Sequence, residues 1–121
     1  MMESILLSIK KLLGIMPEYT NFEDDIIIHI NTAFAILNQL GVGPKNGFMI
    51  VDENSSWGEY TNEKNLNMVK TYIYLKVRLL FDPPTSSALI ESINRTLSEI
   101  EWRIFLEGDP KIEDTPPSAE E

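Results

Sequence analysis

The sequence lacks cysteine altogether and contains a single histidine, His29, among its 121 residues. Without cysteine the chain forms no disulfide, holds no zinc through thiolates and has no thiol nucleophile. Its apolar runs are short, and none approaches the roughly 20 apolar residues that a membrane-spanning helix needs. Residues 1–13 have neither a sustained apolar core nor a small-residue cleavage pattern, so a signal peptide is not expected.

Basic residues are also scarce, since ten lysines and arginines stand against nineteen acidic residues and the formal net charge is -9. Phosphate binding depends on clustered Lys and Arg, so this balance argues against a general duplex-DNA binder. It argues equally against docking on anionic lipid. The charge is uneven: residues 107–121 contain six acids and one base and carry -5, whereas residues 1–106 carry -4.

Residue types that carry out chemistry are few and scattered. His29 lies inside a predicted helix, and no Ser or Asp near it in sequence builds a catalytic triad. The acidic run Glu23-Asp24-Asp25 is typical of a helix N-terminus, because successive helical residues point in different directions and do not converge on a metal. The glycines of segment 41–47 lack the spacing of a phosphate-binding loop. The sequence therefore predicts no catalytic residue, no cofactor and no metal, and hence no enzyme.

Apolar residues recur at helical spacing in four segments, which predict helices over residues 4–13, 22–40, 66–81 and 87–106. The predicted fold class is mainly α, a small four-helix bundle with a β-hairpin or a long loop inserted between the second and third helices. We expect one helical domain over residues 1–106, followed by an acidic, flexible C-terminal tail over residues 107–121.

Local signals mark the ends of these helices. Gly14 and Gly41 end the first and second helices, and Thr85 or Ser86 caps the last one. The pattern Thr20-x-x-Glu23 predicts a capping box at the start of the second helix.

The segment from Gly41 to Tyr60 differs from the rest because it is rich in turn residues. Phe48–Val51 is a short apolar run that predicts a strand, residues 52–56 form a turn, and Trp57–Tyr60 is interpreted as a return strand. A two-stranded hairpin is only marginally stable in water, so we expect this excursion, residues 41–60, to pack against the helices or against another chain.

The third predicted helix, residues 66–81, is apolar on nearly all sides in its last two turns. This pattern predicts burial on more than one side, either against a neighbouring subunit, which we favour, or within one small bundle that surrounds the helix. Lys76 and Arg78 are interpreted as surface residues or as partners of an acid across an interface. Trp102 is expected in the core and Trp57 at an interface, although both could anchor a partner.

Several segments together resemble the small head–tail connector, or adaptor, proteins of tailed phages and their prophages. The resemblance covers residues from about 5 to 106 and rests on Leu40–Pro44, the excursion with Trp57, the stretch Lys70–Pro84 and the stretch Glu99–Arg103 with Trp102. The apolar helix that ends in Phe81-Asp82-Pro83-Pro84 is the most specific part.

The resemblance implies a helical protomer that assembles into a ring, commonly of about twelve subunits related by rotation. The ring would lie below the portal at the capsid vertex, extend the DNA channel without sequence-specific DNA binding, and dock the next stopper or tail-completion protein. The chain would thus be a virion protein of the neck, assembled in the bacterial cytoplasm. It has no catalytic residues to carry over.

Three sets of residues are expected to serve this assembly. The expected subunit interface is Tyr72, Tyr74, Leu75, Lys76, Arg78, Leu79 and Phe81. The expected loop contact with a partner is Phe48, Trp57 and Tyr60. The expected portal-docking residues are Trp102, Phe105, Glu107, Asp109, Glu113 and Asp114. The alternative function is a non-viral, acidic, antitoxin-like regulatory protein that binds a single protein partner.

Overall fold

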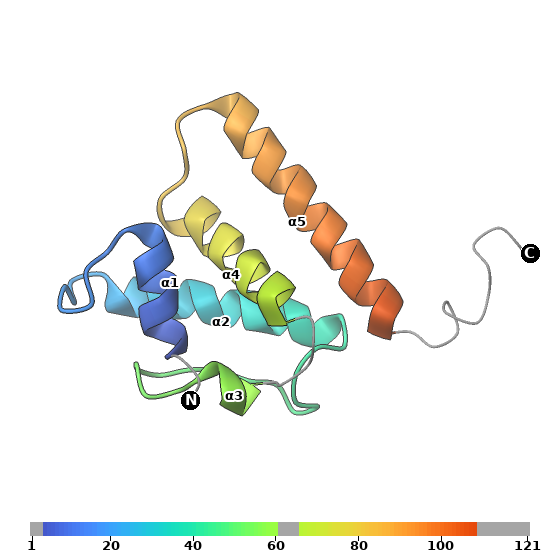
Figure 1. The fold of residues 1–121 in the computed structure, drawn as a ribbon, viewed down its shortest axis with the longest axis horizontal. Coiled ribbons are helices and arrows are strands. Elements are labelled where there is room, and N and C mark those ends of the chain that lie inside the picture. The colour runs from blue at the N-terminus through green and yellow to red at the C-terminus, as the bar shows by residue number, and fades with distance from the viewer. Residues whose placement is uncertain (1–3, 61–65, 109–121) are drawn as a thin grey trace, which may run out of the picture.

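The computed structural model describes residues 4–60 and 66–108, which fold into helices and connecting loops. Figure 1 shows the two longest helices of the second half of the chain side by side and antiparallel. The elements are α1 (Ile5–Leu13), α2 (Glu23–Gln39), α3 (Trp57–Tyr60), α4 (Leu66–Phe81) and α5 (Ser87–Gly108). The prediction of a small, mainly helical bundle is confirmed.

Side-chain and glycine caps begin and end several helices, and the caps at Gly14 and Ser86 are ones that the sequence predicts. Ser4 Oγ accepts the N–H of Leu7 at 3.2 Å at the start of α1. Gly14 ends α1 with a φ of 83°, in the left-handed region where glycine is favoured. Ser86 Oγ accepts the N–H of Leu89 at 3.2 Å, so Ser86 is the cap of α5.

The predicted capping box at the start of α2 is wrong. Phe22 is the N-cap and makes no side-chain hydrogen bond to the helix. Thr20 contributes its backbone carbonyl instead, which accepts the N–H of Glu23 at 3.3 Å. The Glu23 carboxylate turns away because Lys10 binds it, and an ammonium group is a stronger partner than a backbone N–H.

Among the described residues, Lys10 is the charged residue that is fully buried. Its Nζ donates to the backbone carbonyls of Pro17 and Tyr19 at 3.0 and 2.6 Å and to Glu23 Oε2 at 2.7 Å. An ammonium group has three protons, so these three acceptors satisfy it completely. The contacts bind α1, the loop that follows it and the start of α2 into one unit.

The core forms where α4 packs against α1, α2 and α5. This arrangement accounts for the apolar character of α4 on several sides, so the bundle itself provides most of the burial that we had assigned to a neighbouring subunit. The buried residues follow helical stripes, chiefly Ile26, Ile30, Ala33 and Leu37 of α2, Val69, Ile73 and Val77 of α4, and Ile93, Leu97, Ile100 and Ile104 of α5.

The β-hairpin is not found in the described residues, and the excursion between α2 and α4 is a long loop with one short helix. Trp57–Tyr60 is α3 rather than a return strand. Trp57 and Tyr60 are both buried. Residues three apart share a face in a helix but point to opposite faces in a strand, so only a helical turn buries both rings together.

Replacing Lys10 with alanine is expected to lower the free energy of unfolding by about 3 kcal/mol, because Glu23 and two carbonyl oxygens then lose their shared donor. Urea unfolding followed by circular dichroism measures the change. Lys11→Ala is the matched control, since Lys11 is exposed and its loss should cost about 0.5 kcal/mol or less. Equal stability of the two variants would contradict a structural role for the buried ammonium group.

Candidate functional site

The described residues do not bring metal-ligating side chains together. No three His, Asp or Glu side chains among them lie close enough together to bind a metal ion. None of their helices is both long enough and apolar enough to cross a membrane. The features that remain to be explained are surfaces rather than pockets with reactive groups.

The predicted loop contact is largely internal. Trp57 is fully buried, and its Nε1 donates to Ser8 Oγ at 2.8 Å. Tyr60 is 4% exposed, and half-buried Phe48 packs on it with ring centroids 5.2 Å apart. The prediction that Trp57 and Tyr60 contact a partner directly is therefore wrong, because the protomer's own core takes both side chains.

Gly43 holds the excursion close to this aromatic group. Its φ of 90° lies in the left-handed region, and a Cβ built on it would lie 2.6 Å from Tyr60 Cε1. A side chain at this position would therefore be strained and would also collide with the ring. The glycine-rich connection lets the loop fold back onto the end of α2, so the loop is part of the packed body.

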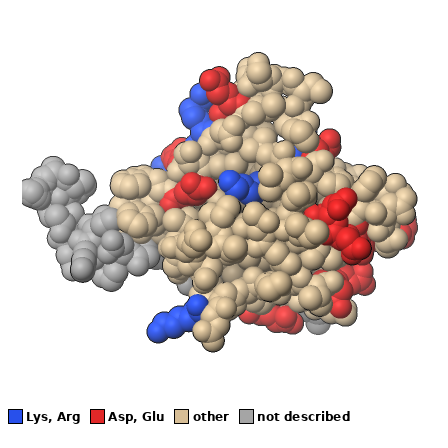
Figure 2. Space-filling model, turned by 180° about the vertical axis from the view of Figure 1, so that it is seen from behind, with Lys and Arg blue, Asp and Glu red and all other residues tan. Residues whose placement is uncertain are grey.

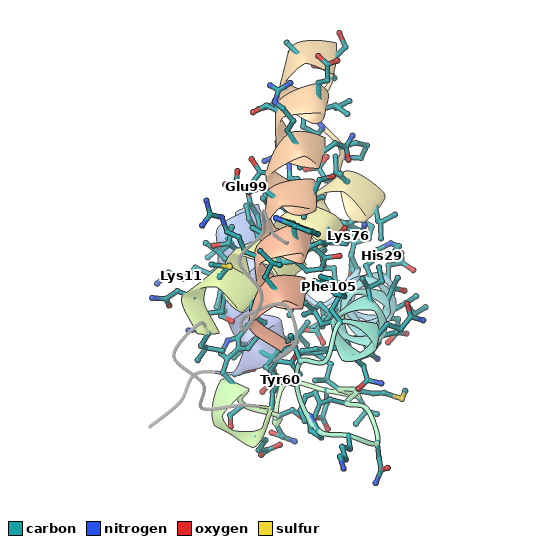
Figure 3. The ribbon with its side chains drawn as sticks, turned by 90° about the vertical axis from the view of Figure 1, so that its right-hand side faces the viewer. Lys11, His29, Tyr60, Lys76, Glu99 and Phe105 are labelled. Carbon is teal, nitrogen blue, oxygen red and sulfur yellow. The ribbon has the colours of Figure 1, made fainter. Side chains whose placement is uncertain are left out.

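Trp102 lies on the surface, so the expectation that it belongs to the core is wrong. Its side chain is 57% exposed, Phe105 is 40% exposed, and the two rings stack with centroids 5.9 Å apart. In an α-helix a residue two positions from the buried Ile100 points about 200° away from it. Figure 3 shows Phe105 on the side of the molecule that α5 covers. We name Trp102 and Phe105 the aromatic pair of α5.

The predicted subunit interface divides into a buried residue and a half-buried rim. Tyr72 is fully buried, and its hydroxyl donates to Glu101 Oε2 at 2.7 Å, so it joins α4 to α5 and is not available to a neighbour. The expectation that Tyr72 lies at a subunit interface is wrong for this reason. The other expected residues are half-buried, namely Tyr74, Leu75, Lys76, Arg78, Leu79 and Phe81.

Lys76 and Arg78 both have partners within the protomer. Lys76 Nζ lies 5.9 Å from the centre of the Tyr72 ring, within the range of a cation–π contact. Arg78 donates to the Asp82 carbonyl at 3.0 Å and to the Tyr74 hydroxyl at 3.3 Å. Of the two interpretations left open by the sequence, placement on the protomer's own surface accounts for both side chains.

An exposed apolar surface that the sequence analysis missed lies at the end of the molecule formed by α1, the 14–22 loop and the end of α4. We name it the apolar end surface and define it as Met16, Tyr19, Phe22 and Leu80, which are 62%, 44%, 44% and 48% exposed. The Phe22 ring lies 5.8 Å from that of Tyr19 and 5.5 Å from that of half-buried Phe81, measured between centroids. Met16, Tyr19 and Phe22 lie before α2 and follow no helical period, so only their residue types signalled this part of the surface.

The apolar end surface and the aromatic pair lie toward opposite ends of the long axis of the molecule, as the 14–22 loop and the end of α5 do in Figure 1. Seen from behind in Figure 2, acidic side chains gather on the right-hand side of the molecule. Exposed acids on the loop and on the first turn of α2, Glu18, Asp24 and Asp25, contribute to that side.

The remaining expected docking residues fall outside what the structure describes. Asp109, Glu113 and Asp114 lie beyond residue 108, and the side chain of Glu107 is likewise outside the described part of the chain. The predicted acidic tail therefore stays a prediction.

The family described as "Phage connector protein" matches residues 5–111 of the chain. No curated protein and no solved structure matches it. The matched range takes in every helix of the described fold, so the whole bundle corresponds to the family's domain.

The Tyr72–Glu101 contact generates a prediction about pH. Burial, the hydrogen bond to Glu101 and the charge of that carboxylate raise the pKa of Tyr72 far above its ordinary value of 10.0. When folding raises the pKa of a hydroxyl, the protonated hydroxyl stabilises the fold fully at pH values below the pKa of the unfolded chain. This stabilisation is lost as the pH rises from the unfolded pKa toward the folded one, because the hydroxyl ionises first in the unfolded chain. Tyr72→Phe should be about 1 kcal/mol less stable at neutral pH, and the deficit should shrink from about pH 10 upward. Urea unfolding across this pH range measures it, and a deficit that stays constant would contradict the assignment.

Proposed function

The chain belongs to the phage connector protein family, and from this premise we propose that it forms an oligomeric ring between the portal and the next protein of the phage neck. The family is structural rather than enzymatic. The ring would extend the DNA channel and give the following stopper or tail-completion protein a surface to dock on. The observation that carries the proposal is the family match over residues 5–111 together with two exposed apolar surfaces on one small protomer.

The separation of these surfaces favours a ring over a closed dimer. A ring is built from heterologous contacts, in which a subunit presents different patches to its two neighbours, and large exposed apolar patches commonly mark such interfaces. The apolar end surface is the candidate for one side of this contact, with half-buried Leu79 and Phe81 of α4 beside it. Tyr74 and Leu75, also half-buried, lie on α4 about two turns closer to its N-terminus than Phe81. The resemblance implies about twelve subunits, which cyclic symmetry would relate to one another.

The aromatic pair of α5 is the candidate for portal docking. Stacked and exposed Trp and Phe rings bury a large area at small entropic cost, and Trp is enriched among the residues that dominate interface energies. The pair stands near the end of α5, immediately before the acidic stretch with Glu107, Asp109, Glu113 and Asp114. We propose that the rings and this stretch bind the portal together.

The charge of the chain suits a conduit for DNA. With a formal net charge of -9 per chain, a ring carries a field that repels phosphate and so disfavours the tight contacts that would hold DNA in place. DNA would then slide through the channel without sequence-specific binding. The protein would act in the virion neck through its geometry, after assembly in the bacterial cytoplasm, with no cofactor and no membrane.

A charge in the apolar end surface should prevent ring formation. Leu80→Glu is the sharpest variant, because Leu80 is 48% exposed and the fold has no need to bury it. A carboxylate desolvated at a subunit contact without a partner opposes association strongly. Thr71→Glu, at an exposed position of the same helix, is the matched control. Negative-stain electron microscopy of both variants on portal-bearing capsids measures the outcome.

We expect rings with Thr71→Glu and none with Leu80→Glu. Rings that persist in the Leu80→Glu variant would contradict the assignment of this surface. A stable complex with a single protein partner, and no association with capsid vertices for the unaltered protein, would favour the antitoxin-like alternative.

Truncation of the aromatic pair should weaken portal docking without unfolding the protomer. Trp102→Ala is expected to lower the affinity for purified portal roughly 30-fold, the effect of losing about 2 kcal/mol at a hot spot. Leu89→Ala is the matched control, since Leu89 is 46% exposed at the other end of α5. Biolayer interferometry on immobilised portal compares the two variants, and equal binding would exclude Trp102 from the docking surface.

A further inference from the structure

Residues 48–50 form a short segment without regular secondary structure that lies on the body of the protein beside α2 and ends in a bend at Val51. Ile50 is 1% exposed, and half-buried Phe48 packs on Phe34 with ring centroids 5.1 Å apart. Met49 and Val51, in contrast, are 68% and 77% exposed. This alternation is that of a β-strand with one face on the core and the other in solvent.

Asn31 of α2 pairs with this segment in the way that a neighbouring strand would. Its Nδ2 donates to the Ile50 carbonyl at 3.0 Å, and its Oδ1 accepts the Ile50 N–H at 2.8 Å. One residue directs both backbone groups to the same side when its backbone is extended, so this double contact is a signature of strand conformation at Ile50. One edge of the segment is therefore satisfied by a side chain of α2.

The opposite edge has no partner within the described residues. The C=O and the N–H of one trans peptide group point in opposite directions, so the Met49 carbonyl and the Val51 N–H, which share their peptide groups with the Ile50 atoms bound by Asn31, point away from Asn31. Neither residue makes a backbone hydrogen bond to another described residue. An edge of this kind is a template on which another extended chain can pair.

We propose that this edge docks an extended segment of a different protein, which adds to Met49 and Val51 as a β-strand. The proposal rests on the proposed function, since the partner is then the adjacent component of the phage neck. Pairing of residues 48–51 with the same segment of a second copy would close a two-fold dimer, and this contact cannot continue around a ring. Side chains of the added strand on its solvent face lie beside Met49 and Val51, so β-branched or apolar residues at alternate positions fit best.

Hydrogen exchange of single amides tests the proposal on the intact protein, alone and as part of an isolated neck assembled on portal-bearing capsids. The Ile50 N–H should be protected in both states, because Asn31 accepts its proton. The N–H groups of Met49 and Val51 should exchange fast in the free protein and at least roughly 10-fold more slowly in the assembled neck.

Three results would overturn the proposal in different ways. If the N–H groups of Met49 and Val51 exchange as fast in the assembled neck as in the free protein, the proposed strand addition is wrong and the proposed function is unaffected. Failure of the unaltered protein to associate with capsids removes the proposed function itself. If the N–H groups of Met49 and Val51 are protected from exchange in the protein alone, and its mass is doubled, the edge pairs with a second copy of the chain.

A pair of variants tests the backbone contact separately from the side chain. Val51→Pro removes the N–H at the outer edge, whereas Val51→Thr keeps it and changes the exposed side chain alone. We expect Val51→Pro rings to bind the next neck component at least roughly 10-fold more weakly than Val51→Thr rings, with ring formation the same in both. Equal binding of the two would overturn the proposal, and the circular dichroism spectrum shows that each variant is folded.

Discussion

The buried ammonium group of Lys10 is the contact on which the apolar end surface depends. A charge withdrawn from water is costly unless every proton has an acceptor, and the three acceptors here come from the 14–22 loop and the first residue of α2. Since the Pro17 and Tyr19 carbonyls must point inward to meet Nζ, the loop has little freedom. Its side chains Met16 and Tyr19 are consequently left outside, where a partner can reach them.

The helices were largely predictable from the sequence because their signals are local. The stripe of apolar residues on α2 and the caps at Gly14 and Ser86 depend on residues within a turn or two of each other. The capping box failed for a non-local reason, since Lys10 lies 13 positions before Glu23 in the sequence and still takes its carboxylate. The hairpin failed similarly, because Asn31 of α2 replaces the second strand.

The candidate surfaces were less predictable, as the two tryptophans show. Trp57 was expected at an interface and is fully buried, whereas Trp102 was expected in the core and is exposed. Both are large rings that favour burial, and the sequence around each does not say whether the protomer or a partner provides it. The apolar stripe of Ile93, Leu97, Ile100 and Ile104 is readable from the sequence, and Trp102 lies off it, but the period alone does not say how far burial extends around the helix.

Two segments without regular structure are thus held by the same device, a polar side chain from a neighbouring helix that satisfies backbone groups on their inner side. Lys10 of α1 does this for the loop before α2, and Asn31 of α2 does it for the segment around Ile50. In both places the anchored backbone leaves apolar side chains facing solvent in a fixed arrangement. Association then requires little further ordering of the chain, which is a main cost of forming an interface. A protomer of this size has few large surfaces. Such anchoring lets short loops act as contacts, and the proposed ring would need several interfaces on each protomer at once.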